Sequence, residues 1–234
     1  MGHANRPALR MRTRRILGTA LGLLMLAGST LQAAAAPLPA PASEAPRPAA
    51  ASSQRAVFAG GCFWGVEAVF RHVKGVTRAV SGYAGGTTVN PSYDAVSGGT
   101  TGHAESVEVT FDPSRVSYGQ LLQVFMSVAH DPTQLNRQGP DVGTQYRSAI
   151  FFTDPSQETA AKAYVAQLTA AKALARPIVT QITPLATFYP AEGYHQNYLA
   201  LHPNQPYIVF NDMPKLAELK VQLPALYTEP VAAR

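Results

Sequence analysis

The sequence of 234 residues contains a single cysteine, Cys62. One cysteine excludes an intramolecular disulfide and any metal centre built from several thiolates. The six histidines show no HExxH spacing, which is the helical pair that binds zinc in metalloproteases, so we expect no metal. No Walker or dinucleotide-binding glycine pattern is present either, and we expect no bound cofactor. Any thiol chemistry must therefore begin at Cys62.

Acidic residues are missing from the first 35 positions, whereas five of the 19 basic residues lie within the first 15. Removing these five arginines leaves 14 basic residues against the 14 acidic ones. The pI near 9.4 is therefore a property of the N-terminal segment. A nucleic-acid-binding protein needs a basic face on its folded domain, so we expect no nucleic-acid partner.

The first 35 residues have the three parts of a secretory signal peptide. Residues 10–15 are rich in arginine, residues 16–27 are apolar, and an Ala-x-Ala pattern ends at Ala35. The apolar run is shorter than the ~20 residues that a membrane-spanning helix needs, so we favour cleavage over an uncleaved anchor. The arginine pair at 14–15 is only a weak match to a twin-arginine signal. We expect cleavage after Ala35 and export to the periplasm.

The segment 36–54 consists mainly of Ala, Pro and Ser. Repeated prolines remove hydrogen-bond donors, and the segment has little to bury, so we expect a disordered linker. The folded domain is predicted to span residues 55–234, which is long enough for one sizeable core. No feature of the sequence indicates a dimer interface, and we expect a monomer.

Within this domain, apolar runs typical of strands are mixed with stretches typical of helices. Strands are predicted at 56–59, 76–82, 106–111, 148–153 and 178–183, and helices at 66–71, 117–128, 155–175 and 192–201. Ser117 and Asp154 are expected to cap the second and third helices. The polar stretches 85–102 and 131–144 are expected to be loops. This order favours an α+β fold over a doubly wound parallel sheet.

Cys62 lies between a predicted strand and a predicted helix, within Gly60-Gly61-Cys62-Phe63-Trp64-Gly65. The glycines allow a sharp turn and keep side chains away from the sulfur. The following helix should point free amide groups at the sulfur and lower the pKa of Cys62. The two aromatic residues after the cysteine offer an apolar wall for a small hydrophobic group. On these residues alone, a nucleophile and an inert buried cysteine are equally good interpretations.

The string Gly-Cys-Phe-Trp-Gly at 61–65 resembles the signature of the A-type peptide methionine sulfoxide reductases. Six further segments resemble blocks of that family in the same order: SGYAGG at 81–86, NPSY at 90–93, TGHAE at 101–105, DPTQLNRQG at 131–139, DVGTQYRS at 141–148 and AEGYHQNY at 191–198. Ordered blocks over roughly residues 55–212 are far more specific than one short motif. The resemblance implies a two-layer α+β sandwich, with helices packed on a mixed or antiparallel sheet around a ferredoxin-like core.

The resemblance implies an oxidoreductase of protein repair under oxidative stress, which reduces the S epimer of methionine sulfoxide, free or in proteins. Cys62 matches the thiolate that attacks the sulfoxide sulfur, and Glu105 matches the acid that protonates the oxygen. Tyr93 and Tyr146 match the phenols that bind this oxygen. Phenols are neutral donors at pH 7, whereas a glutamate must be desolvated before it can donate a proton.

The resemblance also implies a substrate pocket. Phe63 and Trp64 match the residues that hold the methyl group of the substrate. Asp141 matches a residue that lines the site, and we expect it to act through ordered water. His195 and Tyr198 are matched less specifically, as a wall of the site.

Many family members carry further cysteines that resolve the sulfenic acid, but this chain has none after Cys62. We therefore expect Cys62 to be left as a sulfenic acid after one turnover, which an external thiol must reduce. An oxidising periplasm maintains no reducing thiol pool. We expect a dedicated partner that presents a reduced thioredoxin-like site.

Three other functions are compatible with a single reactive cysteine. A one-cysteine thiol peroxidase would share the sulfenic acid but would not need a methyl-sized aromatic pocket. A Cys-dependent acyl transferase or hydrolase needs a histidine paired with the cysteine, for which His103, His130 and His195 are candidates. A non-enzymatic exported module that binds oxidised proteins is the third alternative.

Overall fold

The computed structural model describes residues 1–2, 37–42 and 53–230. Apart from residues 1 and 2, the predicted signal peptide lies outside the described residues, as do residues 43–52 of the predicted linker. None of the helices in the described ranges is both long enough and apolar enough to cross a membrane.

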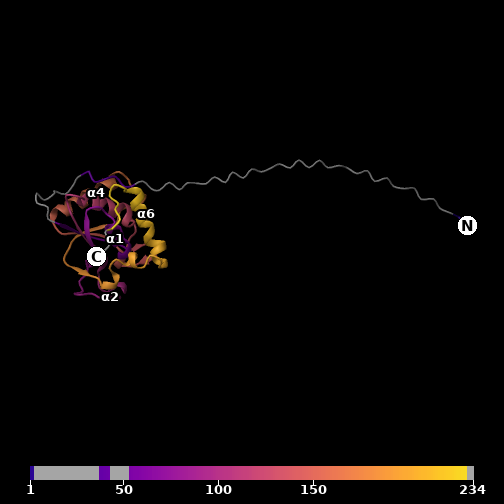
Figure 1. Cartoon of the computed structure of the whole chain (residues 1–234), viewed down its shortest axis with the longest axis horizontal. Helices are drawn as coiled ribbons and strands as arrows, with labels where there is room; N and C mark the ends of the chain where they lie inside the picture. The colour runs from indigo at the N-terminus through magenta and orange to yellow at the C-terminus, as the bar shows by residue number, and fades with distance from the viewer. Residues whose placement is uncertain (3–36, 43–52, 231–234) are drawn as a thin grey trace. The chain divides into compact units, whose positions relative to one another are not determined.

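One sheet of six strands organises residues 53–230, in the order β7-β6-β1-β3-β2-β8. Figure 1 shows the ribbon of these residues. The strands are β1 (Gln54–Gly60), β2 (Val76–Ala84), β3 (Ala104–Phe111), β6 (Ser148–Phe152), β7 (Gln181–Pro184) and β8 (Phe188–Pro190). Neighbouring strands are antiparallel except β6 and β7, which are parallel. A separate hairpin pairs β4 (Arg137–Gln138) with β5 (Asp141–Val142).

The helical elements are interspersed with the strands along the chain. They are α1 (Phe63–Arg71), α2 (Tyr93–Ser97), α3 (Tyr118–Val124), the π-helical η1 (Phe125–Ala129), η2 (Thr144–Tyr146), α4 (Pro155–Ala170), η3 (Gly193–His195), α5 (Tyr198–Leu201), the π-helical η4 (Ile208–Asp212) and α6 (Met213–Gln222). The order β1-α1-β2-β3-α3-β6, with β6-β1-β3-β2 side by side, is the ferredoxin-like arrangement. The predicted α+β class is confirmed.

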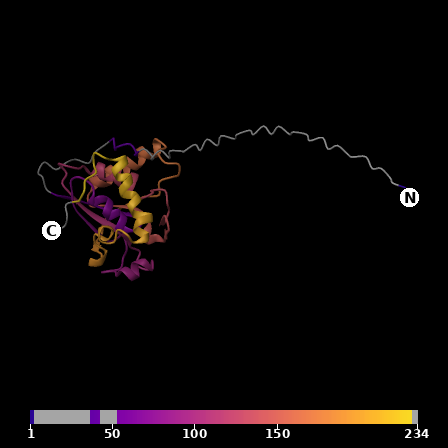
Figure 2. The ribbon, with the colours of Figure 1, turned by 45° about the vertical axis from the view of Figure 1, so that its right-hand side comes forward.

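The main core lies between the sheet and the helices on one of its faces. Along β1, Phe58 points into this core, while Val57 points into a small apolar cluster on the opposite face. Phe58 stacks on Phe70 of α1 at 5.0 Å and on Phe125 at 4.8 Å between ring centroids. Burying each such ring contributes about 1.5–3 kcal/mol. Helix α6 (yellow) packs beside α1 (indigo), as Figure 2 shows.

The two predicted helix caps are present. Ser117 forms a capping box with Gln120, and the Asp154 carboxylate accepts the N–H groups of Ser156 and Gln157. Helix α4 ends at Ala170 rather than at residue 175, because Lys172 adopts a left-handed conformation with φ +50°. The two capping residues thus marked the starts of their helices correctly, whereas the end of α4 was predicted five residues too late.

Several predicted elements need correction. Helix α1 begins at Phe63, directly after Cys62, and not at residue 66. The predicted helix 192–201 is two short helices, since Asn197 between them has φ +55°. The two predicted loops contain the short helix α2 and the hairpin β4–β5. These elements have too few residues to show a periodicity.

Part of the predicted linker is also different from expectation, because residues 37–42 dock on α3, η1 and α4. We call this segment the strap. The partially buried Leu38 packs against the main core. The hydrogen bonds are Leu38 N–H to Ser127 Oγ (3.3 Å), Gln123 Nε2 to Leu38 O (2.7 Å), Tyr164 Oη to Pro39 O (2.8 Å), Gln167 Nε2 to Ala40 O (2.9 Å) and Ala42 N–H to Gln167 Oε1 (2.7 Å). Side chains of the domain thus supply the hydrogen-bond partners for backbone N–H and C=O groups of this proline-rich segment, which forms neither a helix nor a strand.

Candidate active site

A tight turn after β1 places Cys62 at the start of α1. Gly61 has φ +87°, and a Cβ there would lie 2.5 Å from the Gln138 side chain. A Cβ at Gly60 would lie 2.8 Å from the ring of His130. Both contacts are too short for any side chain, so only glycine fits this turn. Cys62 is the N-cap residue of α1 and is 8% exposed.

Glu105 lies against the first amide of the same helix. Its Oε2 accepts the backbone N–H of Phe63 at 3.0 Å, and the side chain is 2% exposed. Burial is the main cause that raises the pKa of Glu105 to about 8, and the nearby carboxylates of Asp141 and Asp212 act in the same direction. This buried carboxyl group can therefore hold a proton at neutral pH beside the cysteine.

The pKa of Cys62 differs from the sequence-based expectation. It is raised well above its ordinary value, mainly by burial and next by the negative charges of Glu105 and Asp212. The backbone N–H of Trp64 and the ammonium group of Lys215 lower it, but by less. The helix amides thus act as predicted, yet burial outweighs them. A proton on Glu105 removes one of the charges that oppose the thiolate.

Two phenols share this environment. The charges of Glu105 and Cys62 both raise the pKa of Tyr93 and of Tyr146, after the larger effect of burial. The four predicted catalytic side chains therefore lie within electrostatic reach of one another. The backbone N–H of Tyr93 donates to Glu192 at 2.9 Å, which anchors the start of α2.

The indole of Trp64 is held on several sides. Its Nε1–H donates to Nδ1 of His195 at 3.1 Å, and its ring stacks on Tyr198 at 3.8 Å and 8°. Because the indole can only donate, a neutral His195 must carry its proton on Nε2. Phe63 is buried and lies 5.0 Å from the His195 ring and 6.5 Å from the Tyr93 ring, between centroids. The five predicted aromatic and histidine residues named here thus form one wall.

Asp141 contacts a residue that sequence reasoning missed. Its Oδ2 accepts a short hydrogen bond from the hydroxyl of Tyr207, whose ring meets that of Trp64 edge-on at 6.0 Å. Asp212 and Lys215 were missed too. They form an ion pair of 3.0 Å, and a Cβ on Gly65 would lie 2.1 Å from the Asp212 carboxylate. The segment that carries these three residues has no distinctive local pattern.

The histidines proposed for a Cys–His pair have other partners. His103 bonds the backbone of Gly86 and Thr88, and His130 bonds Phe125 O and Ser148 Oγ. Burial also lowers the pKa of His130 to about 4. Among the described residues, no histidine forms a hydrogen bond with Cys62. This geometry does not support a Cys–His hydrolase.

Comparison with known proteins decides the family. The family model for peptide methionine sulfoxide reductase matches residues 54–225. The chain is 62% identical over 177 residues to the peptide methionine sulfoxide reductase MsrA 2 of Mesorhizobium japonicum, covering 76% of this chain and 91% of that protein. It is 52% identical over 170 residues to the MsrA 2 of Synechocystis, covering 73% and 79%.

The chain belongs to the peptide methionine sulfoxide reductase family, A type. It is an oxidoreductase that acts on methionine sulfoxide, and enzymes of this family take their electrons from thiols. Two solved structures agree with the fold. One is methionine sulfoxide reductase A of Corynebacterium diphtheriae (TM-score 0.58, 40% identity, 65% of this chain and 76% of that chain). The other is reduced Mxr1 of Saccharomyces cerevisiae (TM-score 0.59, 34% identity, 65% and 87%).

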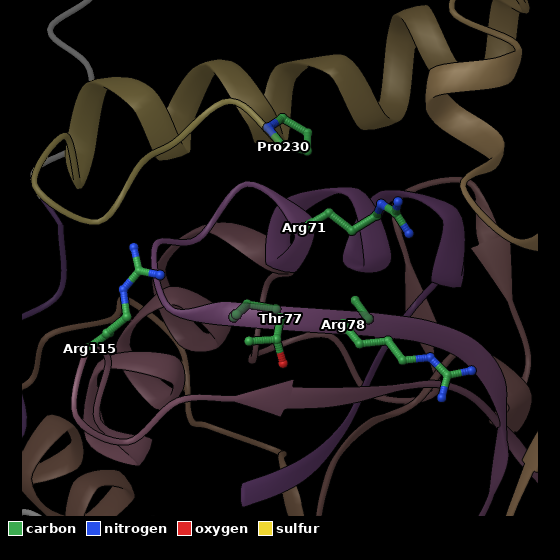
Figure 3. Close-up of a pocket in the computed structure, with 7 residues that line it drawn as sticks. Arg71, Thr77, Arg78, Arg115 and Pro230 are labelled. Atoms are coloured by element: carbon green, nitrogen blue, oxygen red, sulfur yellow. The ribbon is translucent and has the colours of Figure 1, made fainter. Parts of the chain in front are cut away.

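The reductase also has a hollow at the opposite end of α1 from Cys62. Its volume is about 500 Å³. Figure 3 shows residues that line it, among them Arg71, Arg78 and Arg115. It contains none of the predicted site residues. No group of three or more His, Cys, Asp or Glu side chains that could hold a metal occurs in the described ranges.

Proposed function

We propose that this reductase converts the S epimer of methionine sulfoxide into methionine through attack of the Cys62 thiolate on the sulfoxide sulfur. The observation that carries the proposal is the position of Glu105. A buried carboxyl group with a pKa near 8 accepts the Phe63 amide at 3.0 Å, one residue after the only cysteine. A proton donor in this position supports a mechanism in which the departing oxygen is protonated.

The reaction balances without a cofactor. The sulfoxide oxygen passes to Cys62, whose sulfur is oxidised by two electrons to a sulfenic acid, while the substrate sulfur is reduced by two electrons to the thioether. Cys62 gives up its proton when the thiolate forms, the transferred oxygen takes a proton from Glu105, and the ionised Glu105 is reprotonated by the proton that Cys62 gave up. A first external thiol then forms a mixed disulfide with Cys62 and releases water, and a second thiol releases Cys62 as a thiol.

Glu105, Tyr93 and Tyr146 would serve the sulfoxide oxygen. Glu105 donates a proton to this oxygen as the sulfur–oxygen bond breaks, and the two phenols donate hydrogen bonds to it. Burial raises the pKa of both phenols, so they remain neutral donors at pH 7. Donors that are fixed before the reaction cost little reorganisation in the transition state.

The aromatic wall would hold the apolar part of the substrate. Phe63 and Trp64 contact the methyl group, and His195 and Tyr198 support the indole. The bond between Tyr207 and Asp141 closes this wall from another side. Asp141 retains an acceptor for an ordered water that bridges to the substrate.

An external thiol must complete the cycle, because the chain has no second cysteine. We propose a dedicated partner with a reduced thioredoxin-like site. With one equivalent of substrate and no added thiol, mass spectrometry should find a monomer that carries one extra oxygen on Cys62. An intermolecular disulfide dimer as the main product would contradict this part of the proposal.

The decisive experiment compares the two epimers. The enzyme is incubated with dithiothreitol and either the S or the R epimer of a methionine sulfoxide substrate. We expect loss of the S epimer alone, and no turnover by Cys62→Ser. Equal loss of both epimers, or turnover by Cys62→Ser, would overturn the mechanism.

We also propose export. The support is the arginine-rich, apolar and Ala-x-Ala order within residues 1–35. Expression with and without this segment, followed by fractionation and N-terminal sequencing, tests it. We expect a periplasmic product that begins after Ala35, free of the membrane fraction. Retention of the full-length chain in the cytoplasm would contradict export.

A further inference from the structure

Glu67 is a buried carboxylate that the proposed chemistry does not use. It lies on α1 and its side chain is 1% exposed. Its oxygens accept the Ser81 hydroxyl at 2.8 Å and the backbone N–H of Asn197 at 3.0 and 3.1 Å. The guanidinium group of Arg71, one helical turn later, forms an ion pair with Glu67 at 3.3 Å. Glu67 thus joins α1 to strand β2 and to the chain segment between η3 and α5.

Asn197 is the residue that this carboxylate holds in a demanding conformation. Its φ of +55° is left-handed, which costs a non-glycine residue roughly 1 kcal/mol or less when that residue is Asn. Its N–H points at both oxygens of Glu67. A bond from a backbone N–H to a carboxylate is about twice as strong as one to a neutral acceptor, so Glu67 fixes this turn.

The residues on either side of this turn both contact Trp64. His195 accepts the indole N–H at 3.1 Å, and Tyr198 stacks on the indole face at 3.8 Å. Trp64 and Glu67 lie three residues apart on α1, so they share one side of the helix. A shift of the Asn197 turn would therefore move two supports of the indole at once.

We propose that Glu67 is a positioning residue for the substrate pocket: through the Asn197 N–H it fixes His195 and Tyr198 against Trp64. This inference rests on the proposed role of Trp64 in binding the substrate methyl group. Glu67 touches neither Cys62 nor substrate, and its effect is on substrate binding rather than on the nucleophile.

The test exploits two residues that occur once in the chain, Trp64 and Cys62. Tryptophan fluorescence reports the surroundings of Trp64 alone, and alkylation by iodoacetamide reports Cys62 alone. In Glu67→Gln one of the two oxygens becomes an NH₂ group, and the Asn197 N–H keeps only a neutral acceptor, which binds it about half as strongly as the carboxylate does. We expect a red-shifted emission, a KM for the sulfoxide raised roughly fivefold, and an alkylation rate within twofold of the parent.

Two control variants separate positioning from general destabilisation. Arg71→Gln removes the outermost partner of Glu67 but leaves the Asn197 bond, so emission and KM should stay unchanged. Asn197→Gly keeps both the left-handed turn and the N–H, and should also leave them unchanged. Thermal melts of all variants identify those that are folded at the assay temperature.

An unchanged emission or an unchanged KM in folded Glu67→Gln overturns the inference. A parallel fall in the alkylation rate overturns it too, because Glu67 would then act on the nucleophile. Failure of the underlying function has a different signature. If Trp64→Leu leaves KM unchanged, or Cys62→Ser still turns over, the proposed site is wrong, whatever the emission of the Glu67 variant.

Discussion

The hydroxyl of Tyr83 donates to Glu192 at 2.8 Å, while the second oxygen of Glu192 accepts the backbone N–H of Tyr93 at 2.9 Å. One carboxylate thus joins a core phenol on β2 to the start of the short helix α2. Tyr93 is proposed to bind the sulfoxide oxygen, so its position depends on this link.

Glu192→Ala should therefore lower kcat. We expect a fall of about tenfold, because a misplaced oxygen donor weakens stabilisation of the transition state. Tyr83→Phe keeps the Glu192–Tyr93 bond and should cost about 1 kcal/mol of stability with little change in kcat. Steady-state kinetics and urea unfolding measure the two effects. An equal fall of kcat in both variants would contradict the idea that the Glu192–Tyr93 bond, and not the Tyr83–Glu192 bond, positions Tyr93.

Glu105→Gln should slow the reduction step by on the order of 10²-fold or more, which is typical for the loss of a general acid. Single-turnover kinetics with the S epimer measure this step. The acid form of Glu105 exists below the pKa of about 8, whereas the raised pKa of Cys62 makes the thiolate more abundant as the pH rises. The parent rate should therefore rise with pH up to about 8 and then level off, and the variant should lack this change of slope near 8. A twofold effect, or an unchanged pH profile, would remove Glu105 from the mechanism.

Glu105 should also make stability depend on pH. Its pKa is raised in the folded protein, so the folded state binds more protons than the unfolded state between the ordinary pKa and about 8. Stability from this residue is present at acid pH and is lost as the pH rises through that window. Glu105→Gln should therefore raise Tm more at pH 8 than at pH 5. Calorimetry at the two pH values checks the sign.

Removing the strap should lower stability but not activity. Deletion of residues 37–42 breaks its hydrogen bonds and exposes the surface under Leu38, for an expected loss of about 1–3 kcal/mol. Tyr164→Phe, which removes only the bond to Pro39, should cost about 1 kcal/mol. Urea unfolding measures both variants, with kcat as the control. An unchanged unfolding midpoint after the deletion would show that the strap contributes nothing.

The sequence predicted those site residues that lie in motifs with their own local pattern. Cys62 and Glu105 are of this kind, and the structure brings them together. Tyr207, Asp212 and Lys215 were not predicted, since their segment is a π-helix followed by α6 and shows no simple periodicity. Their contacts with Asp141 and with the first turn of α1 exist only after folding.

The same distinction explains the pKa of Cys62. The helix that follows the cysteine can be recognised in the sequence, so its lowering effect on the pKa was predicted. Burial, Glu105 and Asp212 act through tertiary contacts, and together they reverse the direction. Local chemistry was thus predicted correctly, while the balance between local and distant effects needed the fold.

The strap has a mechanical consequence. Its hydrogen bonds to α3, η1 and α4 attach the chain to the domain before β1 begins at Gln54. A pulling force applied upstream is borne first by these bonds, which can break one at a time. Strand β1, whose end positions Cys62, would carry load only after the strap has peeled away.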